Sequence, residues 1–136
     1  MKLLMVYCDK FAYKTTEKKI TSSPDISEEK SYNDVLLSFI HIELQDQYEI
    51  NNMETKLLKT LKAAAKRSKT NRIILYSFDH LSENKANPKL YKEVIEYIRK
   101  RLHDDDYECY STPLGYLIDM EMKAPGTLFG RIFKSL

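Results

Sequence analysis

The segment from Val35 to Leu44 constrains the fold most, because it is apolar at nearly every position. Successive side chains of a strand point to opposite faces, so each face can be read from alternate residues. One face would carry Leu36, Ile40, Ile42 and Leu44, and the other Leu37, Phe39, His41 and Glu43. A strand that is apolar on most of both faces has to be covered on both sides. We therefore expect this segment to be a central strand of a sheet.

Two segments show the spacing of amphipathic helices. From Asn51 to Ser68 apolar residues recur at helical intervals, and Asn51 with Glu54 one turn later resembles a capping box. A second helix is expected to begin at Asn87 and Pro88, because an asparagine cap followed by proline is a frequent helix start. It should end at the acidic turn that begins with Asp104.

Short apolar runs predict further strands at Leu3–Tyr7, Ile73–Tyr76, Tyr107–Tyr110 and Gly115–Lys123. Phe11–Thr15 is expected to return beside the first strand in a hairpin. Ser27–Lys30 should form a short helical turn, and Leu128–Leu136 the start of a helix or a tail. The order of elements predicts an α+β (mixed α/β) fold, in which a mixed sheet packs against two main helices.

Length and charge limit the class of protein. The 136 residues suit a single domain. A net charge of +2 is far below the basic excess of a dedicated nucleic-acid binder, although it permits contact with the end of an RNA. No apolar run approaches the ~20 residues needed to cross a bilayer, and Asp9 comes too early for a secretory signal. We expect a cytoplasmic protein with no membrane partner, whose Cys8 and Cys109 are buried thiols.

Among the three histidines, His80 is the best candidate for a functional role. It follows a predicted strand and precedes a helix, where mixed sheets place ligand-binding groups, and Phe78 beside it offers an aromatic wall for a base or ribose. Position alone leaves a structural role equally open. His103 is expected to be exposed near a helix end, and His41 to have a packing or hydrogen-bonding role. No phosphate loop, nucleophile elbow or metal-ligand spacing is present.

The stretch Tyr76–Ser82, followed by Ala86–Pro88, resembles a motif of archaeal threonyl-tRNA synthetase editing domains. In that family it reads roughly tyrosine, proline, phenylalanine, alanine, histidine, leucine, serine, and later alanine, lysine, proline. Thr112–Tyr116 resembles the family's alanine, proline, phenylalanine, glycine, tyrosine. Together with Met1–Asp9, Pro24–Glu29 and Val35–Glu43, the resemblance covers essentially the whole chain in order.

This resemblance implies the fold of D-aminoacyl-tRNA deacylases, which usually pair as homodimers. It implies hydrolysis of the 3′ ester of seryl-tRNA(Thr), with threonyl-tRNA(Thr) spared and no cofactor in this domain. The partners would be the serine-carrying 3′ end of tRNA(Thr) and the rest of a synthetase chain. We expect residues 1–136 to be one editing domain, taken from the amino-terminal part of a longer synthetase.

The resemblance also assigns roles to residues. His80 would be catalytic, beside the reacting end of the substrate. The loop of Ser77, Phe78 and Asp79 would offer main-chain groups around the seryl moiety, and Ile42 would line the adenine pocket. The facing wall of the substrate site would consist of Pro113, Leu114, Gly115, Tyr116, Leu117 and Ile118.

The chain departs from the family at several of these positions. A tyrosine-lysine pair, of which the lysine is thought to assist catalysis, is replaced by Leu117 and Ile118. A family glutamate aligns with Arg131, and Asp79 replaces an alanine. Either the site is degenerate, or side-chain acid-base groups are not the main source of rate. We favour the second interpretation, in which the 2′-hydroxyl of the tRNA activates water and the backbone stabilises the transition state.

Other hypotheses remain at this point. Lys10, Asp79 or Lys123 could substitute for the missing lysine. The chain could be a D-aminoacyl-tRNA deacylase, but those enzymes use a Gly-Pro dipeptide and this chain has only Pro125-Gly126. It could also be a module that binds the 3′ end of tRNA without catalysis.

Overall fold

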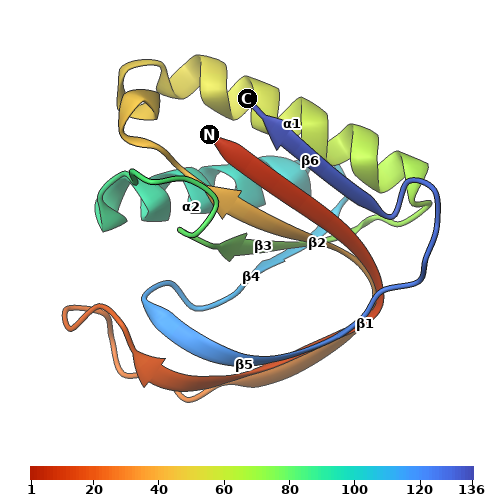
Figure 1. Cartoon of the computed structure of the whole chain (residues 1–136), viewed down its shortest axis with the longest axis horizontal. Coiled ribbons are helices and arrows are strands. Elements are labelled where there is room, and N and C mark those ends of the chain that lie inside the picture. The colour runs from red at the N-terminus through yellow and green to blue at the C-terminus, as the bar shows by residue number, and fades with distance from the viewer.

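The computed structural model describes residues 1–136, which form one mixed sheet and two α-helices (Figure 1). In chain order the elements are β1 Lys2–Lys18, β2 Glu29–His41, the 3₁₀ helix η1 Leu44–Tyr48, α1 Ile50–Arg67, β3 Arg72–Ser77, α2 Pro88–Asp104, β4 Glu108–Ser111, β5 Tyr116–Lys123 and β6 Arg131–Ser135. The strand order is β4-β3-β2-β1-β5, with β6 also paired to β1. The predicted α+β class is therefore confirmed, and β2 is central in the sheet.

The strand β1 is longer than expected. Phe11–Thr15 does not turn back but continues the same 17-residue strand. β2 pairs with β1 over most of this length, from Lys2 opposite His41 to Lys14 opposite Glu29. Asp9 is exposed, so this polar position faces solvent within a strand and does not mark a turn.

The far edge of β1 has two partners. Its first half pairs with β6, where Met5 lies opposite Ile132, and its second half pairs with β5, where Tyr13 lies opposite Met120. The strand bends between the two, so β5 lies well away from α1 (Figure 1). The prediction of a helix or tail at Leu128–Leu136 is wrong, because the backbone there completes the hydrogen bonds of β1. The predicted turn at Ser27–Lys30 is also wrong, since β2 already begins at Glu29.

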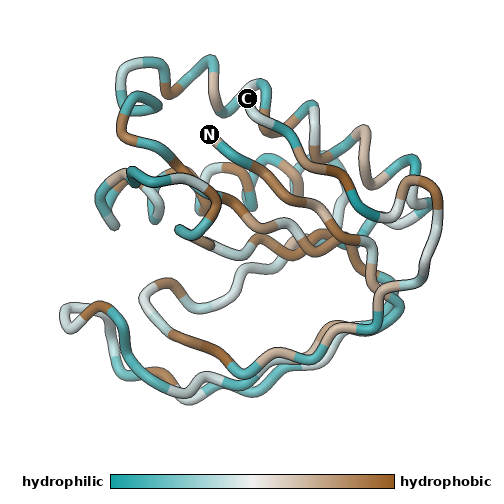
Figure 2. The backbone as a smooth tube through the Cα atoms, viewed as in Figure 1, coloured by the Kyte–Doolittle hydropathy of each residue, from teal (hydrophilic) through white to brown (hydrophobic).

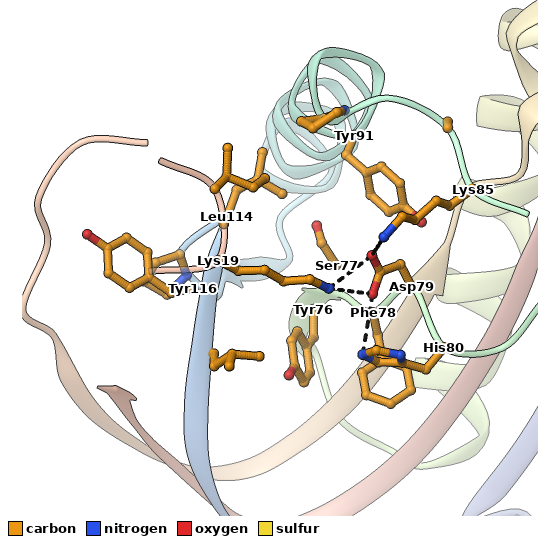
Figure 3. A pocket seen from close by; sticks show the side chains of 16 residues that line it. Lys19, Tyr76, Ser77, Phe78, Asp79, His80, Lys85, Tyr91, Leu114 and Tyr116 are labelled. Carbon is orange, nitrogen blue, oxygen red and sulfur yellow. Dashed lines mark hydrogen bonds and ion pairs between the residues drawn. The ribbon is translucent and has the colours of Figure 1, made fainter. Parts of the chain in front are cut away.

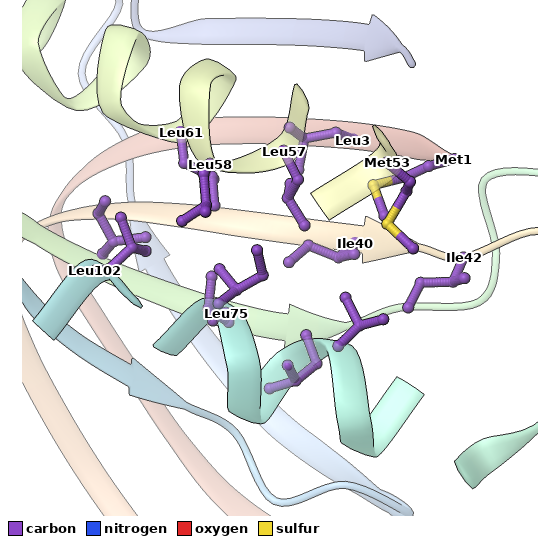
Figure 4. Packing of buried hydrophobic residues seen from close by; sticks show 14 of the residues in the cluster. Met1, Leu3, Ile40, Ile42, Met53, Leu57, Leu58, Leu61, Leu75 and Leu102 are labelled. Carbon is purple, nitrogen blue, oxygen red and sulfur yellow. The ribbon is translucent and has the colours of Figure 1, made fainter. Parts of the chain in front are cut away.

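Both helices pack on the same face of the sheet. Their apolar stripes meet alternate residues of β1, β2 and β3, and the apolar segments in Figure 2 gather where these elements face one another. The fully buried side chains at this contact include Leu3, Ile40, Ile42, Leu57, Leu61 and Leu102 (Figure 4). A smaller cluster on the opposite face contains Phe11, Val35, Leu37 and Phe39. Neither helix has the length and apolar character that a membrane crossing requires.

The two helix starts differ. Asn87 caps α2 as predicted, because its Oδ1 accepts a hydrogen bond of 2.9 Å from the N–H of Leu90. The capping box predicted at Asn51 is wrong, since the N-cap of α1 is Glu49 and no side chain caps it. The chain enters α1 from η1, and it is already helical when it reaches Asn51.

Candidate active site

A cavity of about 220 Å³ lies beside the C-terminal ends of β3 and β4, which run parallel (Figure 3). Parallel strands open toward ligands at this end, because the connections that follow them separate there. The lining residues are Lys19, Ile20, Tyr76, Ser77, Phe78, Asp79, His80, Lys85, Ala86, Pro88, Tyr91, Pro113, Leu114, Gly115, Tyr116 and Leu117. The connections after β1, β3 and β4 thus supply most of its wall.

Most residues that the sequence singled out meet at this cavity. His80, Ser77, Phe78 and Asp79 form one side, and Pro113 to Leu117 form another. Ile42 does not line it, since its side chain is fully buried in the core beneath the helices. Its main chain is nevertheless adjacent, because its N–H donates to the hydroxyl of Tyr91, a lining residue, at 2.9 Å. Ile118 also lies outside the wall and packs against the smaller core cluster.

Two proposed substitutes for the family lysine are far from the reacting region. Lys10 and Lys123 are partners in the register of β1 and β5, and neither lines the cavity. Lys10 forms an exposed ion pair of 3.3 Å with Glu121. The third, Asp79, is a lining residue.

His80 is the exposed histidine of the cavity, with 61% of its side chain accessible. Its Nε2 lies 3.3 Å from Oδ1 of Asp79. Its ring meets that of Phe78 edge to face, with the ring centroids 4.9 Å apart. These contacts leave most of the imidazole open to a substrate.

The buried His41 fixes the loop that carries His80. Its Nδ1 accepts a hydrogen bond of 3.0 Å from the N–H of Leu81, so the ring proton is on Nε2, which donates to the carbonyl of Asn84 at 2.6 Å. This confirms the hydrogen-bonding role expected for His41. It also means that one side chain of β2 sets the path of residues 81–84.

Two consecutive main-chain donors are free in the same loop. Asp79 and His80 lie between β3 and α2, and their N–H groups donate to no other part of the chain. By contrast, the N–H of Phe78 donates to the carbonyl of Ile40 at 2.9 Å. Adjacent unpaired N–H groups beside a cavity can bind an anion or a developing oxyanion with little reorganisation.

Asp79 is the centre of an ion-pair cluster (Figure 3). The Nζ atom of Lys19 lies 2.8 and 3.0 Å from its two carboxylate oxygens, and that of Lys85 lies 2.8 Å from Oδ2. Burial raises the pKa of Asp79, but the hydrogen bonds from Lys19 and Lys85 outweigh it and hold the pKa well below its ordinary range. The carboxyl is therefore ionised at neutral pH and is not a proton donor.

Lys19 and Lys85 were not among the site residues predicted from the sequence. Lys85 follows Asp79 by six positions and lies in the same loop, so the loop's composition could have drawn notice to it. Lys19 is 60 positions away and reaches Asp79 only because β1 ends beside β3's loop. No local sequence pattern predicts the contact between Lys19 and Asp79.

Gly115 joins the Lys19 segment to the opposite wall. Its carbonyl accepts hydrogen bonds from the N–H groups of Lys19 and Ile20, at 2.7 and 3.1 Å. Its φ of +84° is strained for other residues, and a Cβ there would lie 2.2 Å from Oγ of Ser23. The hydroxyl of Tyr116 next to it holds the neighbouring loop, donating to the carbonyl of Pro24 at 2.7 Å. This wall is thus held by main-chain and side-chain hydrogen bonds, around a turn whose positive φ favours glycine at position 115.

The chain has a mixed sheet with two helices on one face and a cavity at the parallel strand ends, and it has the D-aminoacyl-tRNA deacylase-like fold that the sequence predicted. A solved structure titled "c-Myc DNA Unwinding Element Binding Protein" has the same architecture, with a TM-score of 0.61. The match covers 100% of this chain and 99% of that one at 15% identity, which shows a common fold and no more.

The chain belongs to the archaea-specific editing domain family of threonyl-tRNA synthetase, whose sequence model matches residues 1–136. The threonine–tRNA ligase of Thermococcus kodakarensis is 29% identical over 129 residues, and that of Methanococcus aeolicus 26% identical over 127. Each alignment covers 93% of this chain but only 21% and 20% of the relative, so the chain spans about a fifth of their length. This membership supports a proofreading role in translation.

Proposed function

We propose that this chain hydrolyses serine from mischarged seryl-tRNA(Thr) and spares threonyl-tRNA(Thr). The observation that carries the proposal is the cavity, in which His80 and the free N–H groups of Asp79 and His80 lie together in the motif typical of the family. Archaeal threonine–tRNA ligases contain the matching segment, which fits a role in proofreading the product of such a ligase.

The need for such a reaction follows from the two amino acids. Serine lacks one methyl group of threonine, and a missing methylene is worth only ~1–3 kcal/mol of discrimination in a binding pocket. A second cavity that admits serine and excludes threonine by size supplies the rest. The wall formed by Leu114, Gly115 and Tyr116 is rigid enough for this, since it is tied to the segment after β1.

In the proposed reaction, water adds to the ester carbonyl of the aminoacyl group. The 2′-hydroxyl of the terminal ribose orients the water and relays its proton, and the two free N–H groups stabilise the negative charge on the carbonyl oxygen. The bond to the 3′ oxygen then breaks, and that oxygen leaves as the hydroxyl of the tRNA, with serine released. His80 orients the ribose or the water from the exposed side. Water and tRNA are the only other participants, so the proposal needs no cofactor.

A deacylation assay tests the proposal. We expect the chain to release serine from seryl-tRNA(Thr) at least about a hundredfold faster than threonine from threonyl-tRNA(Thr), as a size sieve requires. His80→Ala should slow release, whereas the exposed His103→Ala should not. Equal cleavage of both substrates would overturn the proposal.

Two other functions give different results in the same assay. Cleavage of D-aminoacyl-tRNA with L-seryl-tRNA untouched would indicate a D-aminoacyl-tRNA deacylase. The chain has no Gly-Pro dipeptide, and its Pro125-Gly126 does not line the cavity, which favours editing over this alternative. Binding without any cleavage would indicate a non-catalytic module for the tRNA 3′ end.

The proposal extends to the assembly. We propose that the domain works as a homodimer, at the amino terminus of a longer cytoplasmic synthetase chain whose other parts bind the body of tRNA(Thr). The relatives are about five times longer than the matched segment, which supports a larger chain. Sedimentation of the 136-residue chain tests the dimer, with a monomer at all concentrations contradicting it.

A further inference from the structure

We infer that Lys19 and Lys85, held by Asp79, form a binding site for a phosphodiester of the RNA strand that enters the cavity. This inference rests on the proposed function, since it takes the ligand to be the 3′ end of a tRNA. The family motif has alanine at the position of Asp79, so it has no counterpart of the carboxylate between the two lysines.

The cluster of Lys19, Lys85 and Asp79 carries a net positive charge. Two ammonium groups share one carboxylate, so one cation has no counter-charge within the cluster. Each ammonium has three donors, and Lys85 uses one of them on Asp79. The cluster therefore has both the charge and the hydrogen bonds to accept a further anionic oxygen.

The three side chains of the cluster differ in their exposure to solvent. The side chain of Asp79 is 17% exposed, against 38% for Lys19 and 56% for Lys85. The carboxylate is the inner group and the two ammonium groups are the outer ones. Asp79 thus holds both cations at the rim of the cavity, which reduces the side-chain entropy that anion binding would otherwise cost.

The same charges indicate which part of the substrate is bound. An aminoacyl group carries its own ammonium, which two lysines at the rim would repel. The terminal ester is neutral, and in the proposed reaction the unpaired N–H groups of Asp79 and His80, both lining residues, stabilise the charge that develops on it. The phosphodiesters next to the terminal nucleoside are the anionic groups that remain, and Lys is a common point-charge ligand for them.

The test is the salt dependence with which a short unacylated RNA, ending in a single-stranded 3′ CCA, binds to the 136-residue chain. For single strands, each phosphate contact contributes about 0.7 to the slope of log K against log salt. We expect Lys19→Gln with Lys85→Gln to lower this slope by about 0.7 and to weaken binding roughly three- to tenfold at low salt. Lys59→Gln, which removes an exposed lysine of α1, should change neither.

Two further variants separate charge from local damage. The double variant leaves Asp79 without its lysines, so a triple variant with Asp79→Asn removes that unpaired carboxylate as well. The lower slope and the weaker RNA binding should persist in the triple variant, whereas Lys19→Arg should retain wild-type affinity. An unchanged slope in the triple variant, or no measurable binding by the wild-type chain at low salt, would overturn the inference.

The result is independent of the deacylation assay, because the RNA carries no ester to cleave. If seryl-tRNA is hydrolysed but the slope does not change, the proposed function stands and the phosphate site is wrong. If the slope changes but no ester is cleaved, the phosphate site stands and the editing reaction is wrong.

Discussion

The α-amino nitrogen of Met1 lies 2.8 Å from Oε1 of Glu43, and the two groups are only 0% and 6% exposed. The other oxygen of Glu43 accepts a hydrogen bond of 2.8 Å from the hydroxyl of Ser82. One buried carboxylate thus joins the start of β1 to the loop that carries His80. Burial raises the pKa of Glu43, but hydrogen bonds from the chain terminus and Ser82 outweigh it and lower the pKa to about 2.

Glu43→Gln should destabilise the fold by about 1–3 kcal/mol at neutral pH, because the buried Met1 ammonium loses one of its two carboxylate partners and keeps only Asp46, at 3.0 Å. The pKa of Glu43 is lower in the folded state, so its ionised form stabilises the fold above its ordinary pKa of 4.5. That contribution is lost as the pH falls toward 2. Urea unfolding at neutral pH and near pH 3 measures both effects.

The difference in free energy of unfolding between wild type and Glu43→Gln should therefore become smaller as the pH is lowered. Glu96→Gln, at an exposed position of α2, is the matched control and should match wild type throughout. A gap between wild type and Glu43→Gln that stays constant with pH would contradict the role of this carboxylate.

His41→Phe should loosen the loop that carries His80. It keeps an aromatic ring in the core but removes the part-buried hydrogen bonds to the N–H of Leu81 and the carbonyl of Asn84, at a cost of ~0.5–1.5 kcal/mol for each bond. Hydrogen exchange at the Leu81 amide should accelerate, and seryl-tRNA cleavage should slow. His103→Phe on the surface of α2 should alter neither, and an unchanged Leu81 exchange rate in His41→Phe would rule out the positioning role.

Gly115→Ala should destabilise the chain by ~1–3 kcal/mol, since it forces a side chain onto a positive φ and into Oγ of Ser23. The displaced backbone would also weaken the bonds to Lys19 and Ile20, so deacylation should fall. Thermal melting measures the first effect. Gly126→Ala is the control, because nothing lies within 4 Å of a Cβ at that position. Equal melting temperatures for the two variants would contradict this account.

Ile118→Lys should change the rate of serine release by less than about tenfold. General acid-base catalysis contributes 10²–10⁴-fold where it operates, so a lysine that restored it would raise the rate by far more. Ile118 packs on the smaller core cluster and does not line the cavity, which gives a new ammonium no direct route to the ester. A change of several hundredfold in single-turnover deacylation would refute catalysis by backbone and substrate.

The parts of the fold that sequence could predict are those determined by local patterns. Alternation along the strand predicted at Val35–Leu44 and the Asn87-Pro88 helix start both depend on neighbouring residues. Both appear in the structure, except that β2 ends at His41 and the exposed Leu44 already belongs to η1. The length of β1 and the existence of β6 depend on pairing between opposite ends of the chain, such as Leu3 with Lys134. A polar residue such as Asp9 therefore suggests a turn when only its neighbours in the sequence are considered, although it lies within β1.

The candidate site could likewise be predicted from the sequence only in part. The motif around His80 marked the loop, and the motif at Thr112–Tyr116 marked the facing wall. The residues that give the cavity its charge were not predictable, because Lys19 meets Asp79 only through the bend of β1. The side-chain directions of Ile42 and Ile118 were not predictable either, since a strand residue turned toward the core can have its backbone beside a cavity.

The uninterrupted β1 has a consequence for how this chain can change over evolutionary time. One strand begins at the buried Met1 amine and ends beside Lys19, so its register links the anchored terminus to the rim of the cavity. Insertion or deletion of one residue within it would turn every later side chain to the opposite face. Residues 20–28 outside the strands can vary in length at lower cost. Lineages should therefore diversify this domain by lengthening that loop, while β1 keeps its residue count.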